Sequence, residues 1–158
     1  MSRNPSDTIR FLPVGLSVRG APCLVVGGGS IGGRKAQTLL RGGAVVTVVA
    51  PTISTELTSL VEDGRIRWLA EPFCAGHVAG AFLVVAATNS EGVNASVMRE
   101  ASIAGALVCD ASSAERSQVI FGALLHRDDA TIAVFTDGHD PARARDLRNQ
   151  IGNCLSDA

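Results

Sequence analysis

The sequence of 158 residues has no strong excess of charge and no long apolar run. Its 14 Lys and Arg nearly balance 15 Asp and Glu, so the chain carries no basic field for nucleic acid or an anionic membrane. No apolar stretch reaches the roughly 18 residues that a transmembrane helix needs, and residues 1–13 contain no apolar signal core. We therefore expect a cytoplasmic protein with no nucleic-acid or membrane partner.

Cysteine is sparse and shows no paired spacing. The 4 cysteines form no Cys-x-x-Cys motif, and two of them, Cys23 and Cys109, fall within apolar runs. Buried free thiols are common in such runs, and reduced thiols are typical of the cytoplasm. We therefore expect no metal site in the chain.

The chain is apolar enough to fold around a core of its own. Hydrophobic residues make up 46% and charged residues 18% of the sequence, a composition typical of globular proteins. The length fits one domain of ordinary size, or one domain with a small appendage.

Short apolar runs alternate with helical segments over the first two thirds of the chain. The runs are apolar throughout, as expected for strands that are buried on both faces. Strands are predicted at residues 23–26, 45–49, 66–69, 82–86 and 106–109, and helices at residues 31–41, 55–63 and 94–104. This alternation predicts an α/β fold of the Rossmann type, with a doubly wound parallel sheet within residues 10–112.

The pattern changes after about Ser112. Residues 119–125 and 131–136 each fit a strand or a helix around a charged turn. Residues 141–153, with Pro141 in the first turn, predict an amphipathic helix. We therefore expect residues 113–158 to form a small second module.

A glycine-rich turn connects the first predicted strand to the first predicted helix. Its pattern is Gly27-x-Gly29-x-x-Gly32. In such a turn the first glycine permits the sharp bend, the second lets a pyrophosphate approach the backbone, and the third brings the helix close to the strand. The helix N-terminus then presents free N–H groups to the phosphates. This pattern predicts NAD as the cofactor.

The ends of two other predicted strands complete the expected cofactor site. The second strand runs into Ala50-Pro51 without the carboxylate that often binds the ribose, so NAD would bind without this contact or less selectively. The strand at residues 82–86 ends at the same edge of the sheet, where backbone groups and Thr88 can reach the ribose or the nicotinamide. The predicted cofactor-binding residues are Gly27, Gly28, Gly29, Ser30, Ile31, Gly32, Pro51, Ala87, Thr88 and Asn89.

Several segments together resemble one known family. They are FLPV at residues 11–14, VVGGG at 25–29, RKA at 34–36, VVAP at 48–51, FLVVAATN at 82–89, VN at 93–94 and DPARAR at 140–145. The combination is similar to the precorrin-2 dehydrogenase / sirohydrochlorin ferrochelatase family, which forms the N-terminal part of siroheme synthase and its stand-alone relatives.

The resemblance implies a homodimeric enzyme that uses NAD⁺ to oxidise precorrin-2, a tetrapyrrole, to sirohydrochlorin in siroheme biosynthesis. Some members of the family also insert Fe²⁺. It assigns dimerisation and part of the substrate site to residues 113–158, a module that is truncated relative to the family. Basic side chains would pair with the tetrapyrrole carboxylates, and the predicted substrate-binding residues are Thr136, Arg143 and Arg145.

The expected catalytic residues depart from the family pattern. Where the family has a general-base aspartate, this sequence has Ser112, and Asp110 lies two residues earlier. His139 is a third acid/base candidate. Two alternatives stay open: a relative that binds NAD or a tetrapyrrole without catalysis, and a metal chelatase that uses Asp110, Asp137, His139 and Asp140.

Overall fold

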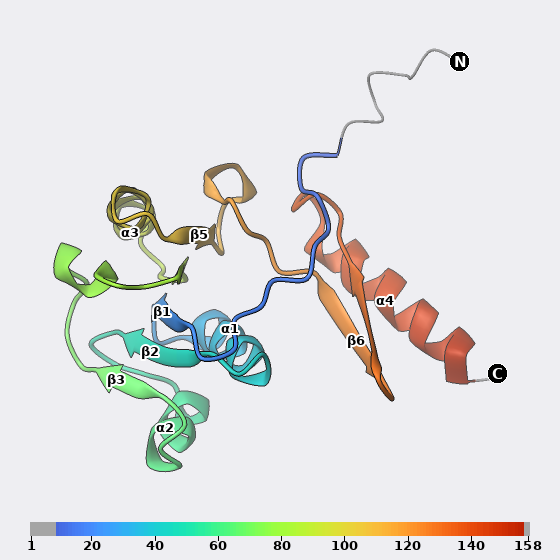
Figure 1. The fold of residues 1–158 in the computed structure, drawn as a ribbon, viewed down its shortest axis with the longest axis horizontal. Helices are drawn as coiled ribbons and strands as arrows, with labels where there is room; N and C mark the ends of the chain where they lie inside the picture. The colour runs from blue at the N-terminus through green and yellow to red at the C-terminus, as the bar shows by residue number, and fades with distance from the viewer. Residues whose placement is uncertain (1–8, 157–158) are drawn as a thin grey trace. The chain divides into compact units, whose positions relative to one another are not determined.

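A parallel sheet with helices forms the larger of two units in the computed structural model, which describes residues 9–156 (Figure 1). This unit spans Leu16–Val119. Its strands are β1 (Pro22–Val26), β2 (Val45–Val49), β3 (Arg67–Leu69), β4 (Leu83–Ala86) and β5 (Leu107–Asp110). All neighbouring strands are parallel, in the order β3-β2-β1-β4-β5, which confirms the predicted Rossmann-type fold.

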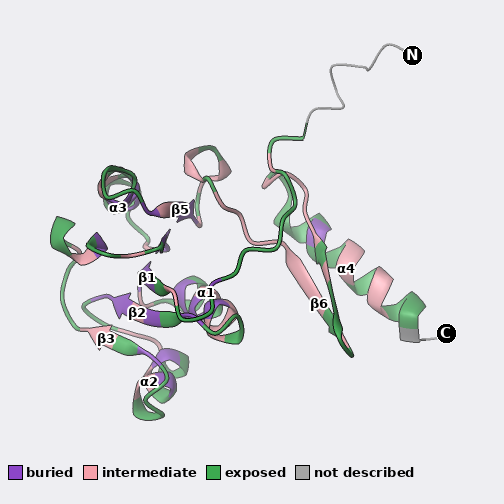
Figure 2. Ribbon diagram, in the orientation of Figure 1, coloured by how far each residue is buried: buried purple, intermediate pink, exposed green. Residues whose placement is uncertain are grey.

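Helices cover both faces of this sheet (Figure 1). They are α1 (Ser30–Arg41), α2 (Thr55–Glu62) and α3 (Glu91–Ile103), with short 3₁₀ helices η2 (Ala75–Val78) and η3 (Ala114–Arg116). On one face, Val97 of α3 packs in a hydrophobic core with Leu24 and Val84. On the other face, α1 lies against β1 at Val25. Buried residues concentrate in the sheet (Figure 2), as its apolar sequences predict.

Helix α3 begins at Glu91, three residues before the predicted start. The Ser90 hydroxyl caps this end by accepting a hydrogen bond from the Val93 N–H at 3.3 Å. Gly92 lies in the first turn and obscures the start in the sequence, because glycine is a weak helix former. The other predicted strands and helices of this unit begin and end within one residue of the prediction, whereas the sequence does not predict η2 or η3.

The second unit consists of a β-hairpin and a helix, together with the described residues up to Gly15. Its elements are β6 (Ala123–Arg127), β7 (Ala130–Val134) and α4 (Pro141–Ser156), and the two strands pair antiparallel. The backbone N–H groups of Arg10 and Phe11 donate to the Asp137 carboxylate at 3.1 and 3.3 Å. These bonds attach the N-terminal segment to the turn before α4.

The boundary between the two units lies between Val119 and Ile120, seven residues after the expected boundary between residues 112 and 113. The N–H groups of Gln118 and Val119 both donate to the carbonyl of Val108 in β5, at 2.9 and 3.0 Å, so this segment stays attached to the sheet. The ambiguous run at residues 119–125 consequently forms a strand only from Ala123, and its partner run is also a strand. Among residues 9–156, no helix has the length and apolar character to cross a bilayer.

Candidate functional site

A pocket of about 680 Å³ opens at the carboxyl edge of the parallel sheet. It lies where β1 and β4 are neighbours, while the helices that follow them, α1 and α3, cover opposite faces. Parallel α/β sheets bind ligands at such switch points. The lining comes from residues 26–29, 49–54, 72–73 and 87–90, together with Val93.

The three glycines of the Gly27-x-Gly29-x-x-Gly32 pattern have different surroundings. Gly27 has a φ of +124°, and a Cβ there would collide with the carbonyl of Ala87. A Cβ at Gly32 would collide with the carbonyl of Gly27, so this glycine lets α1 approach the turn. A Cβ at Gly29 would meet no protein atom within 4 Å. Protein packing therefore explains Gly27 and Gly32, whereas the open space at Gly29 leaves room for a ligand to approach the backbone.

The N-terminus of α1 is open toward a ligand. Gly29 is its N-cap and provides no side-chain hydrogen bond, and the first turn carries no acidic residue. The first N–H groups of a helix lack partners within the helix, and the helix dipole adds partial positive charge at this end. Together with the open space at Gly29, these features fit the diphosphate of a dinucleotide.

The pocket wall beyond β2 is mostly apolar, with Thr52 and Ser54 as its polar residues. Ile53, Pro72 and Phe73 line this side, and no Asp or Glu belongs to the lining described here. The indole N–H of Trp68 donates to the Ala50 carbonyl at 2.9 Å and so fixes the end of β2. This wall offers a surface for an adenine ring but no carboxylate for the ribose, as expected from Ala50-Pro51.

Thr88, on the opposite wall, is fixed by a single side chain. Asn94 of α3 is buried, with 1% of its surface exposed. Its Oδ1 accepts hydrogen bonds from the Thr88 N–H at 3.1 Å and the Thr88 hydroxyl at 2.7 Å, and its Nδ2 donates to the Thr88 carbonyl at 3.1 Å. Asn94 therefore sets the position of the loop that follows β4.

Asp110 is buried at the end of β5, and both of its carboxylate oxygens have partners. Oδ1 accepts from the Ser112 N–H at 2.8 Å and the Ser112 hydroxyl at 2.6 Å, and Oδ2 accepts from Arg116 Nε at 2.7 Å. Burial alone would raise the pKa of Asp110, but the hydrogen bonds from Ser112 and Arg116 outweigh it and hold this pKa below its ordinary value. The Asp110 carboxylate is therefore ionised at neutral pH, and both of its oxygens accept hydrogen bonds within the protein.

Ser112 connects this ion pair to the Thr88 loop. Asn94 Nδ2 donates to the Ser112 hydroxyl oxygen at 3.4 Å, and Arg116 Nη2 donates to the same oxygen at 3.4 Å. The predicted catalytic residues Asp110 and Ser112 thus belong to one polar network with Thr88.

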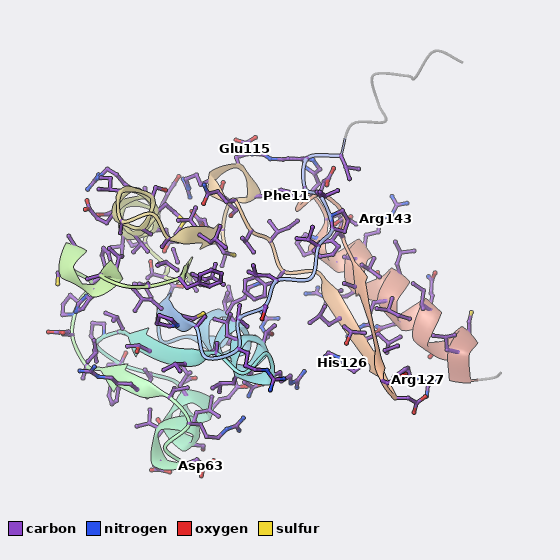
Figure 3. The ribbon with its side chains drawn as sticks, in the orientation of Figure 1. Phe11, Asp63, Glu115, His126, Arg127 and Arg143 are labelled. Atoms are coloured by element: carbon purple, nitrogen blue, oxygen red, sulfur yellow. The ribbon has the colours of Figure 1, made fainter. Side chains whose placement is uncertain are left out.

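The predicted residues of the second unit lie around the start of α4. The Thr136 hydroxyl donates to the Asp140 carbonyl at 2.7 Å, and the Asp140 carboxylate accepts from the Arg143 N–H at 2.9 Å. His139 is exposed in the turn before the helix, and Arg143 and Arg145 are exposed on the helix. Figure 3 labels Arg143 on α4. Nowhere in residues 9–156 do three His, Cys, Asp or Glu side chains gather as a metal-binding group.

Most of the predicted cofactor residues share the pocket. Those that line it are Gly27, Gly28, Gly29, Pro51, Ala87, Thr88 and Asn89. Ser30 and Ile31 are exposed in the first turn of α1, and Gly32 is buried beneath it. Sequence reasoning did not identify Phe73, Asn94 or Arg116, since their roles depend on contacts between separate segments.

A family model and a solved structure both match most of this chain. The family model described as "Putative NAD(P)-binding" matches residues 14–123. The solved structure titled "SirC, precorrin-2 dehydrogenase" is 30% identical, with a TM-score of 0.79, and the match covers 90% of this chain and 70% of that one. The chain belongs to the SirC family.

The sequence of this SirC family member is also similar to curated siroheme synthases. "Siroheme synthase 1" of Aeromonas salmonicida is 38% identical over 141 residues, and "Siroheme synthase" of Neisseria meningitidis is 36% identical over 143 residues. These matches cover 89% and 90% of this chain. The chain spans about 30% of the length of each relative and is homologous to its N-terminal part.

Proposed function

We propose that this chain is an NAD-dependent dehydrogenase that oxidises precorrin-2 to sirohydrochlorin in siroheme biosynthesis. The observation that carries the proposal is the open space at Gly29, the N-cap of α1, which we call the diphosphate cradle. The chain that contains it is 30% identical to a precorrin-2 dehydrogenase, with a TM-score of 0.79. The same cradle supports NAD as the cofactor. An enzyme of this kind would act in the cytoplasm, where NAD⁺ is supplied.

Different segments of the pocket would hold different parts of the cofactor. The turn at Gly27–Gly29 and the N-terminus of α1 would hold the diphosphate, and the loop at Thr88–Asn89 would orient the nicotinamide end. When bound, NAD⁺ supplies the hydride acceptor for the oxidation. The protein's own task is to place the macrocycle against the cofactor and to accept a proton.

The hydrogen bonds around Asp110 indicate different roles for the three proposed catalytic residues in accepting this proton. Both oxygens of Asp110 already accept hydrogen bonds, so we assign Asp110 to holding Arg116 and Ser112 in place. We propose the exposed His139 as the group that accepts the proton, and Ser112, whose hydroxyl donates to Asp110 Oδ1, as a residue that positions the network. Thr136, Arg143 and Arg145 are proposed to meet the carboxylates of the substrate.

We also propose a homodimer formed through the second unit. The β6–β7 sheet has two strands, so each strand has one edge without a partner in the described part of the chain. An isolated two-stranded hairpin is only marginally stable, and α4 packs against one of its faces, at Leu125. A second copy of the hairpin would cover the remaining surface.

An anaerobic assay with precorrin-2 and NAD⁺ tests the function. We expect NADH and sirohydrochlorin to form in equal amounts. Binding of NAD⁺ without turnover would instead favour a non-catalytic relative. Insertion of Fe²⁺ into sirohydrochlorin without NAD would favour a chelatase.

A further inference from the structure

Arg116 lies between a buried carboxylate and an exposed one. Its Nε donates to Asp110 Oδ2 at 2.7 Å, and its Nη1 donates to Glu91 Oε1 at 3.0 Å. The Asp110 side chain is 0% exposed, the Arg116 side chain 32% and the Glu91 side chain 82%. One edge of the guanidinium is therefore fixed inside the protein, while the other faces solvent.

The two carboxylates differ in how easily they can be replaced. Asp110 also accepts two hydrogen bonds from Ser112, so it is held from several directions. Glu91 accepts a hydrogen bond from Arg116, and its side chain is otherwise open to solvent. Exposed ion pairs are weak because water screens them and because both side chains lose freedom. An incoming carboxylate can therefore displace Glu91 at small cost, whereas it cannot displace Asp110.

The exposed edge of Arg116 lies beside the cofactor pocket. Glu91 directly follows Ser90, which lines the pocket. Asp110 ends β5, where it pairs with Ala86 at the end of β4, next to the pocket-lining Ala87. A macrocycle placed against the nicotinamide end of the pocket would extend over this same edge of the sheet.

We propose that Arg116 binds a carboxylate of the substrate, and that Glu91 occupies the position of this carboxylate when substrate is absent. The inference rests on the proposed function, because it takes the substrate to be a tetrapyrrole with several carboxylate side chains. Arg116 suits the task because its planar guanidinium binds carboxylates through two parallel hydrogen bonds. Asp110 acts as the residue that holds the guanidinium in position.

Binding of uroporphyrin, a polycarboxylate macrocycle, to the full chain with NAD⁺ present tests this site without requiring turnover. Glu91→Gln removes the competing charge, and we expect uroporphyrin to bind about threefold more tightly. Arg116→Gln removes the proposed carboxylate ligand, and we expect a loss of about tenfold or more in affinity. Arg116→Lys, which keeps the charge but loses the planar fork, should give an intermediate value.

Glu62→Gln is the matched control, because Glu62 is exposed at the far end of α2. It should leave uroporphyrin affinity unchanged. Glu91→Gln keeps the test decisive even where Arg116→Gln fails to fold, since the Glu91 side chain is exposed. Unchanged affinity in Glu91→Gln, or in a folded Arg116→Gln protein, would overturn the proposal.

The same variants separate this inference from the proposed function. Turnover of precorrin-2 with an unchanged KM in Arg116→Gln would overturn the carboxylate site and leave the dehydrogenase intact. The opposite result is also distinguishable. If uroporphyrin binding depends on Arg116 but the chain forms no NADH from precorrin-2, the carboxylate site is supported and the dehydrogenase activity is rejected.

Discussion

At the scale of single residues, Gly29 is the position where ligand binding and folding can be separated. Replacement by serine adds a Cβ that would meet no protein atom within 4 Å, and serine is a favoured helix N-cap. We expect Gly29→Ser to keep or slightly raise the melting temperature. NAD⁺ binding should weaken by about tenfold or more, because the new side chain obstructs the phosphates and competes for their N–H donors.

Calorimetric NAD⁺ titration and thermal unfolding of the same samples measure both effects. Gly76→Ser is the control, because a Cβ at Gly76 also meets nothing within 4 Å but this residue does not line the pocket. Wild-type NAD⁺ affinity in Gly29→Ser would place the diphosphate elsewhere.

Asp110 gives the unfolding free energy a dependence on pH. Its folded pKa lies below the ordinary value of 3.8, because hydrogen bonds from Ser112 and Arg116 outweigh the effect of burial. The stabilisation is therefore fully present above the unfolded pKa and is lost as the pH falls through the folded pKa. We expect wild-type stability to decline below about pH 4, and to decline less steeply in Asp110→Asn.

Urea unfolding at a series of pH values measures this slope. The informative quantity is the slope and not the absolute stability, since Asp110→Asn also weakens the contact with Arg116 at neutral pH. Parallel slopes in the two proteins would show that Asp110 has the same pKa in the folded and unfolded states.

At the scale of elements, α3 controls the loop after β4 through Asn94. Asn94→Ala would leave the Thr88 N–H and carbonyl without their partners. Thr88 is half-buried, so leaving these groups unpaired costs less than the about 1–3 kcal/mol of a fully buried group, and we expect modestly lower stability together with a raised KM for NAD⁺. Because Asn94 also donates to the Ser112 hydroxyl, we expect kcat to fall together with the rise in KM.

Steady-state kinetics with varied NAD⁺ and denaturant unfolding measure these two quantities. Asn149→Ala, at an exposed position of α4, is the control for loss of an asparagine and should change neither. A change in stability with an unchanged KM for NAD⁺ would limit Asn94 to a structural role.

Local sequence signals predict the elements of the sheet unit but not the contacts between them. The apolar strands are recognisable because strands buried on both faces are apolar throughout, and the glycine spacing is recognisable because backbone sterics require it. The partnership of Arg116 with Asp110 and Glu91 joins η3, β5 and α3, and no periodicity encodes it. The division after Val119 has a similar origin, because the hydrogen bonds of residues 118–119 to Val108 join segments that are separate in the sequence.

At the scale of the whole molecule, the second unit has one face of its hairpin covered by α4. Strand register places Ala133 opposite Leu124 and Thr131 opposite His126 on the face away from Leu125, which packs near Gly152 of α4. Ala133 is exposed there. A second copy that buries this face would bring apolar surface together and stabilise both hairpins.

Sedimentation equilibrium should therefore give twice the chain mass of 16.3 kDa at micromolar concentrations. Ala133→Glu places a charge on the open face, and burying two such charges across a symmetric interface is unfavourable, so this variant should shift the equilibrium toward monomer. Gln150→Glu adds the same charge at an exposed position of α4 and should remain dimeric. A wild-type chain that sediments as a monomer would reject the dimer, whereas dimeric Ala133→Glu would move the interface to another face of the unit.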